Sequence, residues 1–175
     1  MGSEFKLTRE VEFSDVDMAG IMNFLNFFRF MEAAERAFFQ SLGISIHQAG
    51  SRLGWPRVHA ACDFKHPLRF EDVVEICLFV REKRKKSIVY SFVFRKLNEQ
   101  PAREVARGTL AVACVRLDKR GGKMTGIPIP KAIRDKIEVA TEAHYIRAPN
   151  HLRFRRSERP SGAPARKTPR ASGGV

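Results

Sequence analysis

The chain has 175 residues, of which 43% are hydrophobic and 29% are charged. This length and balance are typical of one globular domain and exclude a wholly disordered chain. The apolar runs fall well short of the roughly 18–20 residues of a membrane-spanning helix, and we expect no secretory signal. Because Cys62, Cys77 and Cys114 form no C-x-x-C pair, the sequence predicts neither a disulfide framework nor a bound metal, and favours the cytoplasm.

Positive charge is concentrated near the C-terminal end of the sequence. Lys and Arg number 32 against 19 Asp and Glu, which gives a net charge of +13. Residues 153–175 contain seven of those cations and one acid, together with three Pro, three Gly and three Ser. Such a segment buries too little apolar surface to order itself, so we predict a folded domain over residues 1–152 and a disordered tail over residues 153–175. A solubilising tail is favoured over a loose anchor for RNA, DNA or an acidic membrane.

The N-terminal part of the sequence predicts a strand, a turn and a long helix. Residues Phe5–Phe13 partly alternate between apolar and polar side chains, and the polar stretch Ser14–Gly20 follows. We expect the helix to begin after the N-cap residue Asn23 and to end before Gly43. At about 100° per residue its polar side chains form one narrow stripe, which consists of Asn26, Arg29, Glu32, Arg36 and Gln40. Since the rest of its surface is apolar, we expect the protein to enclose most of this helix.

The following part of the sequence predicts four strands joined by short turns, which we expect to pair as an antiparallel meander. These strands are Val58–His66, Val73–Val80, Ser87–Phe94 and Val105–Leu117. Gly108 is interpreted as a possible bulge in the last strand, and Ile129–Val139 as a short helix. The resulting architecture is α+β, with one antiparallel sheet curled around one helix. Val74, Val89 and Val93 are expected to make the other face of the sheet apolar, as a dimer or tetramer interface requires.

The segment Val11–Phe30 resembles the opening of the 4-hydroxybenzoyl-CoA thioesterase family. It carries the apolar-x-F-x-D-x-D pattern, then an A-G turn, and then the N-F start of the helix. The segments Cys62–Asp72 and Glu82–Ser87 resemble two less specific markers of the same family. The likeness covers roughly residues 5–120 and implies the hotdog fold, in which an antiparallel sheet wraps around one long central helix.

The resemblance also implies site residues. The family's catalytic carboxylate maps onto Asp17, as nucleophile or general base, and the backbone N–H that holds the thioester carbonyl maps onto Phe24. A helix N-terminus has unpaired N–H groups that suit a developing oxyanion, which agrees with this assignment. Asn26 is expected to orient the turn or line the pocket, with a solvated helix position as the alternative. Arg84 and Lys86, on the basic hairpin, are the candidates for binding the CoA phosphates.

We therefore expect an acyl-CoA thioesterase that hydrolyses an aromatic or medium-chain acyl-CoA to the free acid and CoA. The CoA thioester is the substrate, no cofactor is expected, and the resemblance implies a homodimer or homotetramer with the site between subunits. A non-catalytic acyl-CoA-binding hotdog module is the alternative, because a fold does not determine function. Asp15 is expected to make a structural hydrogen bond, and Glu35, about 16 Å from Phe24 along the helix, a buried ion pair. The histidines His59 and His66 are interpreted as structural.

Overall fold

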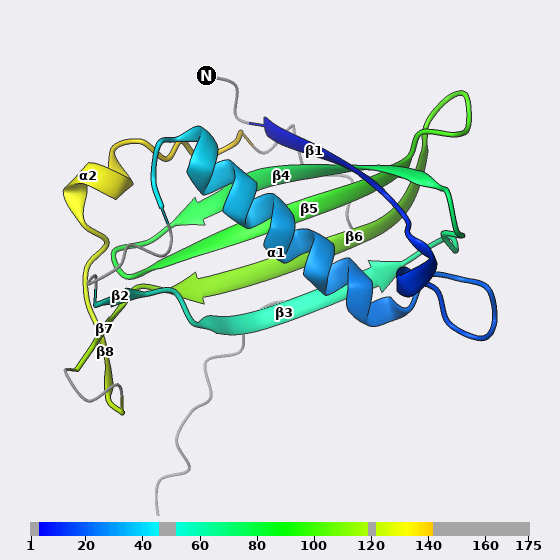
Figure 1. The fold of residues 1–175 in the computed structure, drawn as a ribbon. Coiled ribbons are helices and arrows are strands. Elements are labelled where there is room, and N and C mark those ends of the chain that lie inside the picture. The colour runs from blue at the N-terminus through cyan, green and yellow to red at the C-terminus, as the bar shows by residue number, and fades with distance from the viewer. Residues whose placement is uncertain (1–3, 46–51, 119–121, 142–175) are drawn as a thin grey trace, which may run out of the picture.

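The computed structural model describes residues 4–45, 52–118 and 122–141. Its main sheet is antiparallel and has five strands in the order β1–β4–β5–β6–β3. Their bounds are β1 Glu4–Glu10, β3 Arg57–Phe64, β4 Val73–Lys83, β5 Ser87–Lys96 and β6 Arg103–Ala113. A second, three-stranded sheet consists of β2 (Leu53–Gly54), β7 (Val115–Leu117) and β8 (Met124–Gly126). The helices are α1 (Phe24–Ser41) and α2 (Lys131–Arg134), and α1 lies diagonally across one face of the main sheet (Figure 1).

Local signals set both ends of α1, as predicted. The side chain of Asn23 accepts a hydrogen bond from the Leu25 N–H at 3.0 Å, which caps the N-terminus. At the other end Gly43 has a φ of +67°, the left-handed conformation that glycine adopts most readily. The side chains that α1 buries against the sheet include Phe27, Phe30, Met31, Ala34 and Phe39.

The enclosure of α1 is less complete than the sequence predicted. Phe24 and Leu25, in the first turn, keep 56% and 55% of their surface exposed. Asn26 is the reverse case, because it lies on the predicted polar stripe and yet is buried. The helix is therefore covered along the side that faces the sheet, while its apolar N-terminal tip is open in the single chain.

Gly108 is not a bulge, contrary to the prediction. It pairs in regular register with Cys62 of β3 and with Phe92 of β5. A Cβ at this position would overlap the sulfur of Met31 and would lie 3.3 Å from its terminal methyl carbon. Glycine is needed here because the helix approaches β6 closely, which is a tertiary requirement that the sequence alone does not show.

The predicted four-strand meander is wrong for β3. Strands β4, β5 and β6 are consecutive neighbours, but β3 pairs with β6 at the far edge of the sheet. The place beside β4 is taken by β1, in a register that pairs Leu7 with Ile76. Residues 65–72 therefore cross from the edge strand β3, past β6 and β5, to β4. On the way the carbonyl of Leu68 accepts the N–H of Met22 at 2.7 Å. The helix that the sequence predicted at Ile129–Val139 is limited to α2.

The sheet face opposite α1 is not the exposed apolar surface that the sequence predicted. Val74 packs in the core on the helix side, and Val93 forms a buried cluster with Cys77, Phe79 and Ala140. The chain thus covers part of this face itself, through the segment that follows α2. None of the exposed large hydrophobic side chains of the described residues belongs to β4, β5 or β6.

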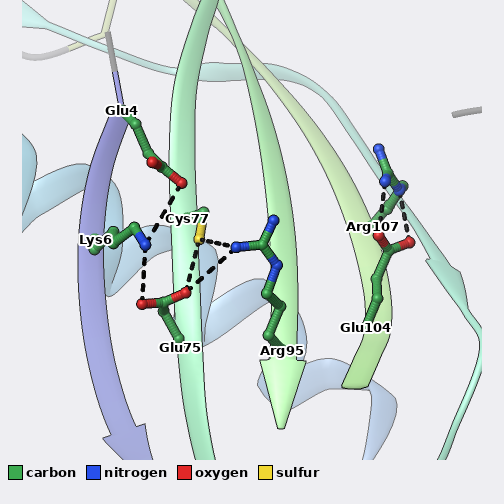
Figure 2. A network of polar contacts seen from close by, with 7 residues as sticks. All are labelled: Glu4, Lys6, Glu75, Cys77, Arg95, Glu104 and Arg107. Carbon is green, nitrogen blue, oxygen red and sulfur yellow. Dashed lines mark hydrogen bonds and ion pairs between the residues drawn. The ribbon is translucent and has the colours of Figure 1, made fainter. Parts of the chain in front are cut away.

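Ion pairs occupy the rest of that face (Figure 2). The carboxylate of Glu75 lies 3.2 Å from Lys6 Nζ and 3.6 Å from Arg95 Nη1, and it accepts the Cys77 thiol at 3.3 Å. On β6, Glu104 receives two hydrogen bonds from the Arg107 guanidinium, at 2.7 and 2.6 Å, and also pairs with Lys65. These pairs keep this part of the sheet polar.

The predicted tail, residues 153–175, lies outside the described residues, as does the boundary at residue 152. Neither helix of the described chain combines the length and the hydropathy that crossing a membrane would demand.

Candidate active site

Asp17 is in the turn that joins β1 to α1. Its N–H donates to the Ile21 carbonyl at 2.9 Å, and its carboxylate Oδ1 accepts the Ala19 N–H at 2.8 Å. Gly20, which has a φ of +70°, closes the turn by donating to the Asp17 carbonyl at 2.9 Å. The side chain is exposed, and its Oδ2 makes no hydrogen bond within the described residues. One carboxylate oxygen therefore holds the turn, and the other is open to a ligand.

Asp15 makes the structural hydrogen bond that was predicted for it. Its carboxylate accepts the Glu12 N–H at 3.0 Å, which fixes the short 3-10 helical turn Phe13–Asp15. The Asp15 carbonyl accepts both the Asn23 N–H at 2.9 Å and the Asn26 side-chain amide at 2.8 Å. Asn26 is thus not a solvated position: it ties the Asp17 turn to the first turn of α1.

Among the described residues, the helix tip beside this turn has one backbone donor that makes no hydrogen bond. The Leu25 N–H is taken by the Asn23 side chain, and the Asn26 N–H donates to the Asn23 carbonyl at 2.9 Å. Within the described residues, no hydrogen bond uses the Phe24 N–H. A free N–H at this position adds to the partial positive charge of the helix N-terminus, so a carbonyl oxygen or an oxyanion would find a donor there.

Aromatic side chains surround the tip. Phe27 packs edge-on against Phe64 of β3 with ring centroids 5.0 Å apart, and Phe13 meets Phe70 in the same manner at 6.0 Å. Most of the exposed large hydrophobic residues of the described chain gather here, and they are Phe13, Met18, Phe24, Leu25, Phe64 and Phe70. Sequence reasoning singled out only Phe24 from this group. Phe64 ends β3 and Phe70 lies in the crossing segment that follows it, and the sequence predicted that β3 pairs with β4.

The structure does not bring Arg84 and Lys86 to this place within one chain. They lie in the β4–β5 turn, whereas the Asp17 turn lies at the opposite end of the sheet, where β4 begins (Figure 1). At roughly 3.3 Å per residue, the 11 residues of β4 separate the two groups by about 35 Å. Arg84 pairs with Glu82 at 2.6 Å, and Lys86 Nζ donates to the Gly126 carbonyl at 3.0 Å. Within one chain, Arg84 and Lys86 therefore do not belong to the site at the Asp17 turn.

Glu35 forms the buried ion pair that the sequence predicted. Only 2% of its side chain is exposed, and Oε2 lies 2.8 Å from Nη2 of Arg57, the first residue of β3. Burial raises the pKa of Glu35 to about 7, although the Arg57 guanidinium opposes the shift. Burial also raises the pKa of Tyr90, and the nearby charge of Glu35 raises it further. This cluster connects α1 to two strands and is remote from the helix tip.

The cysteines Cys62 and Cys77 are poor candidates for a catalytic nucleophile. Burial raises the pKa of Cys62 to about 12 and also raises that of Cys77, so neither thiol is a nucleophile near neutral pH. His66 is exposed, and His59 is half-buried on β3. The part of the chain that the structure describes contains no group of three or more His, Cys, Asp or Glu arranged to hold a metal ion.

Comparisons with known proteins agree with the fold. Residues 11–137 match the family model of the thioesterase-like superfamily. The chain is 31% identical over 94 residues to 4-hydroxybenzoyl-CoA thioesterase from Pseudomonas sp. (strain CBS-3), which covers 51% of this chain and 66% of that protein. It is 27% identical over 103 residues to 1,4-dihydroxy-2-naphthoyl-CoA hydrolase from Prochlorococcus marinus (strain NATL1A), covering 54% and 69% of the two chains.

A solved structure of a gentisyl-coenzyme A thioesterase superposes with a TM-score of 0.65 and 31% identity, and the match covers 74% of this chain and 98% of the other. The predicted α+β hotdog fold, with an antiparallel sheet and one main helix, is thereby confirmed. The chain belongs to the thioesterase-like superfamily, the family that the Val11–Phe30 segment resembles.

Proposed function

We propose that the protein hydrolyses aromatic acyl-CoA thioesters to the free acid and CoA, with Asp17 and the Phe24 N–H at the reacting carbonyl. The observation that carries the proposal is the free N–H of Phe24 beside a turn that presents the open Oδ2 of Asp17. Three relatives, whose names specify 4-hydroxybenzoyl-, dihydroxynaphthoyl- and gentisyl-CoA, support an aromatic acyl group. The exposed phenylalanines at the helix tip offer an apolar surface for such a ring.

The chemistry requires an acid–base or nucleophilic carboxylate and a donor for the oxyanion. The Phe24 N–H would donate to the carbonyl oxygen as negative charge develops on it, an effect worth about 3 kcal/mol for a well-placed donor. Asp17 Oδ2 would either attack the carbonyl carbon, giving an acyl-aspartyl anhydride that water then opens, or take a proton from an attacking water. In both routes the C–S bond breaks, CoA leaves as the thiol, and water supplies the new oxygen of the acid. Asn26 would act as a positioning residue, because it holds the turn through the Asp15 carbonyl.

A homodimer would complete this site. Among the described strands, β3 is an edge strand with a neighbour on one side only, and its Val58 and Phe64 are 62% and 50% exposed. If two copies paired antiparallel through β3, one copy would be reversed end for end. The basic β4–β5 turn of one copy would then lie on the same side as the Asp17 turn of the other. Arg84 and Lys86 would bind the CoA phosphates in trans, which accounts for the long separation within one chain.

Replacement of Asp17 by Asn tests the catalytic role. Thiol release is measured on benzoyl-, 4-hydroxybenzoyl-, phenylacetyl-, naphthoyl- and straight-chain CoA thioesters, with Glu10→Gln as a control that removes another exposed carboxylate at the same end of the molecule. We expect Asp17→Asn to lower turnover about a hundredfold or more, with the best wild-type rates on aromatic groups, and the control to keep its activity. Unchanged turnover of a folded Asp17→Asn variant would exclude the assignment.

The second candidate function is a non-catalytic acyl-CoA-binding module. It is favoured by the hydrogen bond from Ala19 to Asp17 Oδ1, since aspartate commonly serves as a turn former in just this way. This alternative predicts saturable binding of acyl-CoA with no thiol release from any thioester of the panel, and with equal affinity in the Asp17→Asn variant.

A further inference from the structure

The positive charge of the described residues lies at one end of the molecule. We define the basic end as residues 81–86, 116–118, 122–126 and 131–138, which form the β4–β5 turn, the β7–β8 hairpin and the segment around α2. These segments contain ten Lys and Arg against four Asp and Glu, whereas all other described residues together contain twelve against thirteen. The fold therefore gathers the whole net positive charge of the described chain into a small part of its surface.

Hydrogen bonds join these segments into one surface. The Lys83 ammonium donates to the carbonyls of Arg134 and Ile137 at 2.9 and 2.6 Å, and Arg134 Nη1 donates to the Arg84 carbonyl at 3.3 Å. Lys86 connects the β4–β5 turn to β8 through the Gly126 carbonyl. In Figure 1 the end of β4, the β7–β8 hairpin and α2 all lie on the left, whereas the turn that carries Asp17 lies on the right.

The charge of the basic end is not neutralised within the described residues. Among the described residues, ion pairs join Arg81 and Arg84 to Glu82. Four further cations donate to neutral carbonyl oxygens, which leaves their charge in place: Lys83, Lys86, Arg134 and Lys136. The Lys136 ammonium donates to the Leu42 carbonyl at 3.0 Å. The cations that are exposed to solvent are Arg84, Lys85, Lys86, Arg116, Lys123, Lys131 and Lys136.

We propose that the basic end docks an acidic carrier protein that presents the acyl group on a phosphopantetheine arm. The inference rests on the proposed thioesterase function, and it concerns the group to which the acyl chain is attached. CoA and a carrier protein present the same pantetheine thioester, but CoA offers only its three phosphoryl groups to the surrounding cations. Seven exposed cations from three segments form a larger surface than these groups can contact, whereas the acidic side chains of a carrier protein would face all of it.

The chemistry of the surface favours a protein over a nucleic acid. Binding of single-stranded nucleic acid relies on aromatic side chains that stack with bases. The exposed aromatic residues of the described chain, which are Phe13, Phe24, Phe64 and Phe70, all lie at the Asp17 end. The exposed large hydrophobic residues at or next to the basic end are Met124 and Val139, which suit a small apolar contact surrounded by charges.

The test compares one acyl group on two carriers. The 4-hydroxybenzoyl thioesters of CoA and of a purified acidic acyl carrier protein are hydrolysed by the wild-type protein and by a Lys123→Glu/Lys131→Glu variant. Both lysines are exposed and make no ion pair with the described residues, and neither belongs to the proposed CoA-binding set. An Arg29→Glu/Arg36→Glu variant, which reverses two exposed cations outside the basic end that also make no ion pair with the described residues, is the matched control.

We expect the Lys123→Glu/Lys131→Glu variant to lose about tenfold or more in kcat/KM on the carrier-protein substrate and less than about twofold on the CoA substrate. Raising the salt concentration from about 50 to about 300 mM should reproduce this difference with the wild-type protein. An equal loss on both substrates, or no loss on the carrier protein, would overturn the inference, as would an RNA or DNA oligonucleotide that displaces the carrier protein at equal concentration. Absence of thiol release from both substrates would refute the proposed function instead, and salt-dependent binding of the unacylated carrier protein would then test the docking separately.

Discussion

The buried carboxylate of Glu35 predicts how the stability of the fold depends on pH. Its pKa is raised from an ordinary value of 4.5 to about 7 because burial penalises the charged form more than Arg57 stabilises it. Below pH 4.5 the carboxyl is protonated in both the folded and the unfolded chain, so it carries no penalty. As the pH rises from about 4.5 to about 7, the unfolded chain loses this proton first, and folding becomes less favourable.

The size of the effect follows from the pKa difference. A shift from 4.5 to about 7 corresponds to about 3 kcal/mol of unfolding free energy, at roughly 1.36 kcal/mol per pKa unit. Gln has the shape of the neutral acid and does not titrate, so Glu35→Gln removes this dependence. Arg57 is not left without a partner in the variant, because its Nη2 also lies 3.3 Å from Glu32. The unfolding free energy of the wild type minus that of the variant should therefore fall by up to about 3 kcal/mol between pH 4.5 and pH 8.

Urea unfolding at several pH values measures that difference directly. All other titrating groups are shared by the two proteins, so their contributions cancel when the curves are subtracted. Glu32→Gln is the matched control: its carboxylate contacts the same guanidinium but is 63% exposed, and we expect a difference within about 0.5 kcal/mol at every pH. Parallel pH curves for the wild type and Glu35→Gln would refute the argument, since burial would then not control this ionisation.

Two further predictions concern the packing and the start of α1. Replacing Gly108 by Ala should destabilise the protein by about 1–3 kcal/mol in urea unfolding, because the added methyl overlaps Met31, and combining it with Met31→Ala should cost less than the two single changes added together. If the loss of unfolding free energy in the double variant equalled the sum of the two single losses, the two positions would not be in contact. Asn23→Ala should lower the unfolding free energy, again measured in urea, by about 0.5–2 kcal/mol, because the cap on the Leu25 N–H is lost. Gln40→Ala, at an exposed position near the other end of the helix, is the control and should leave the unfolding free energy nearly unchanged. A stable Asn23→Ala variant would mean that the cap contributes little.

The elements themselves were largely predictable because their signals are local. The Asn23 cap and Gly43 delimit α1 as expected, and the four predicted strand segments correspond to β3, β4, β5 and the pair β6 and β7. Strand pairing was not predictable in the same way. The expectation that β3 pairs with β4 followed from their closeness in sequence. In the structure β1 pairs with that side of β4, and the sequence of neither strand shows which of the two β4 prefers.

The candidate site was predictable only in part, for the same reason. Asp17, Phe24 and Asn26 lie within ten residues of one another, and the structure places them around one turn and one helix tip. Arg84 and Lys86 were assigned to the same site from a motif, and the sheet sets them at the other end of the chain. The sequence left open whether Asn26 orients the turn or is solvated, because helical periodicity shows which face a residue occupies but not what lies beyond that face.

By itself, the sequence determined the helix with its two ends, the strand segments, the family and the motif at Asp17, since each of these depends on residues close together along the chain. Only the tertiary structure decided which strands meet, that Arg57 is the partner of the buried Glu35, and that the cations of three separate segments gather on one surface. These features depend on contacts between residues far apart in sequence. Such contacts follow from how the strands compete for neighbours and from how closely α1 packs on the sheet, and both are properties of the whole fold.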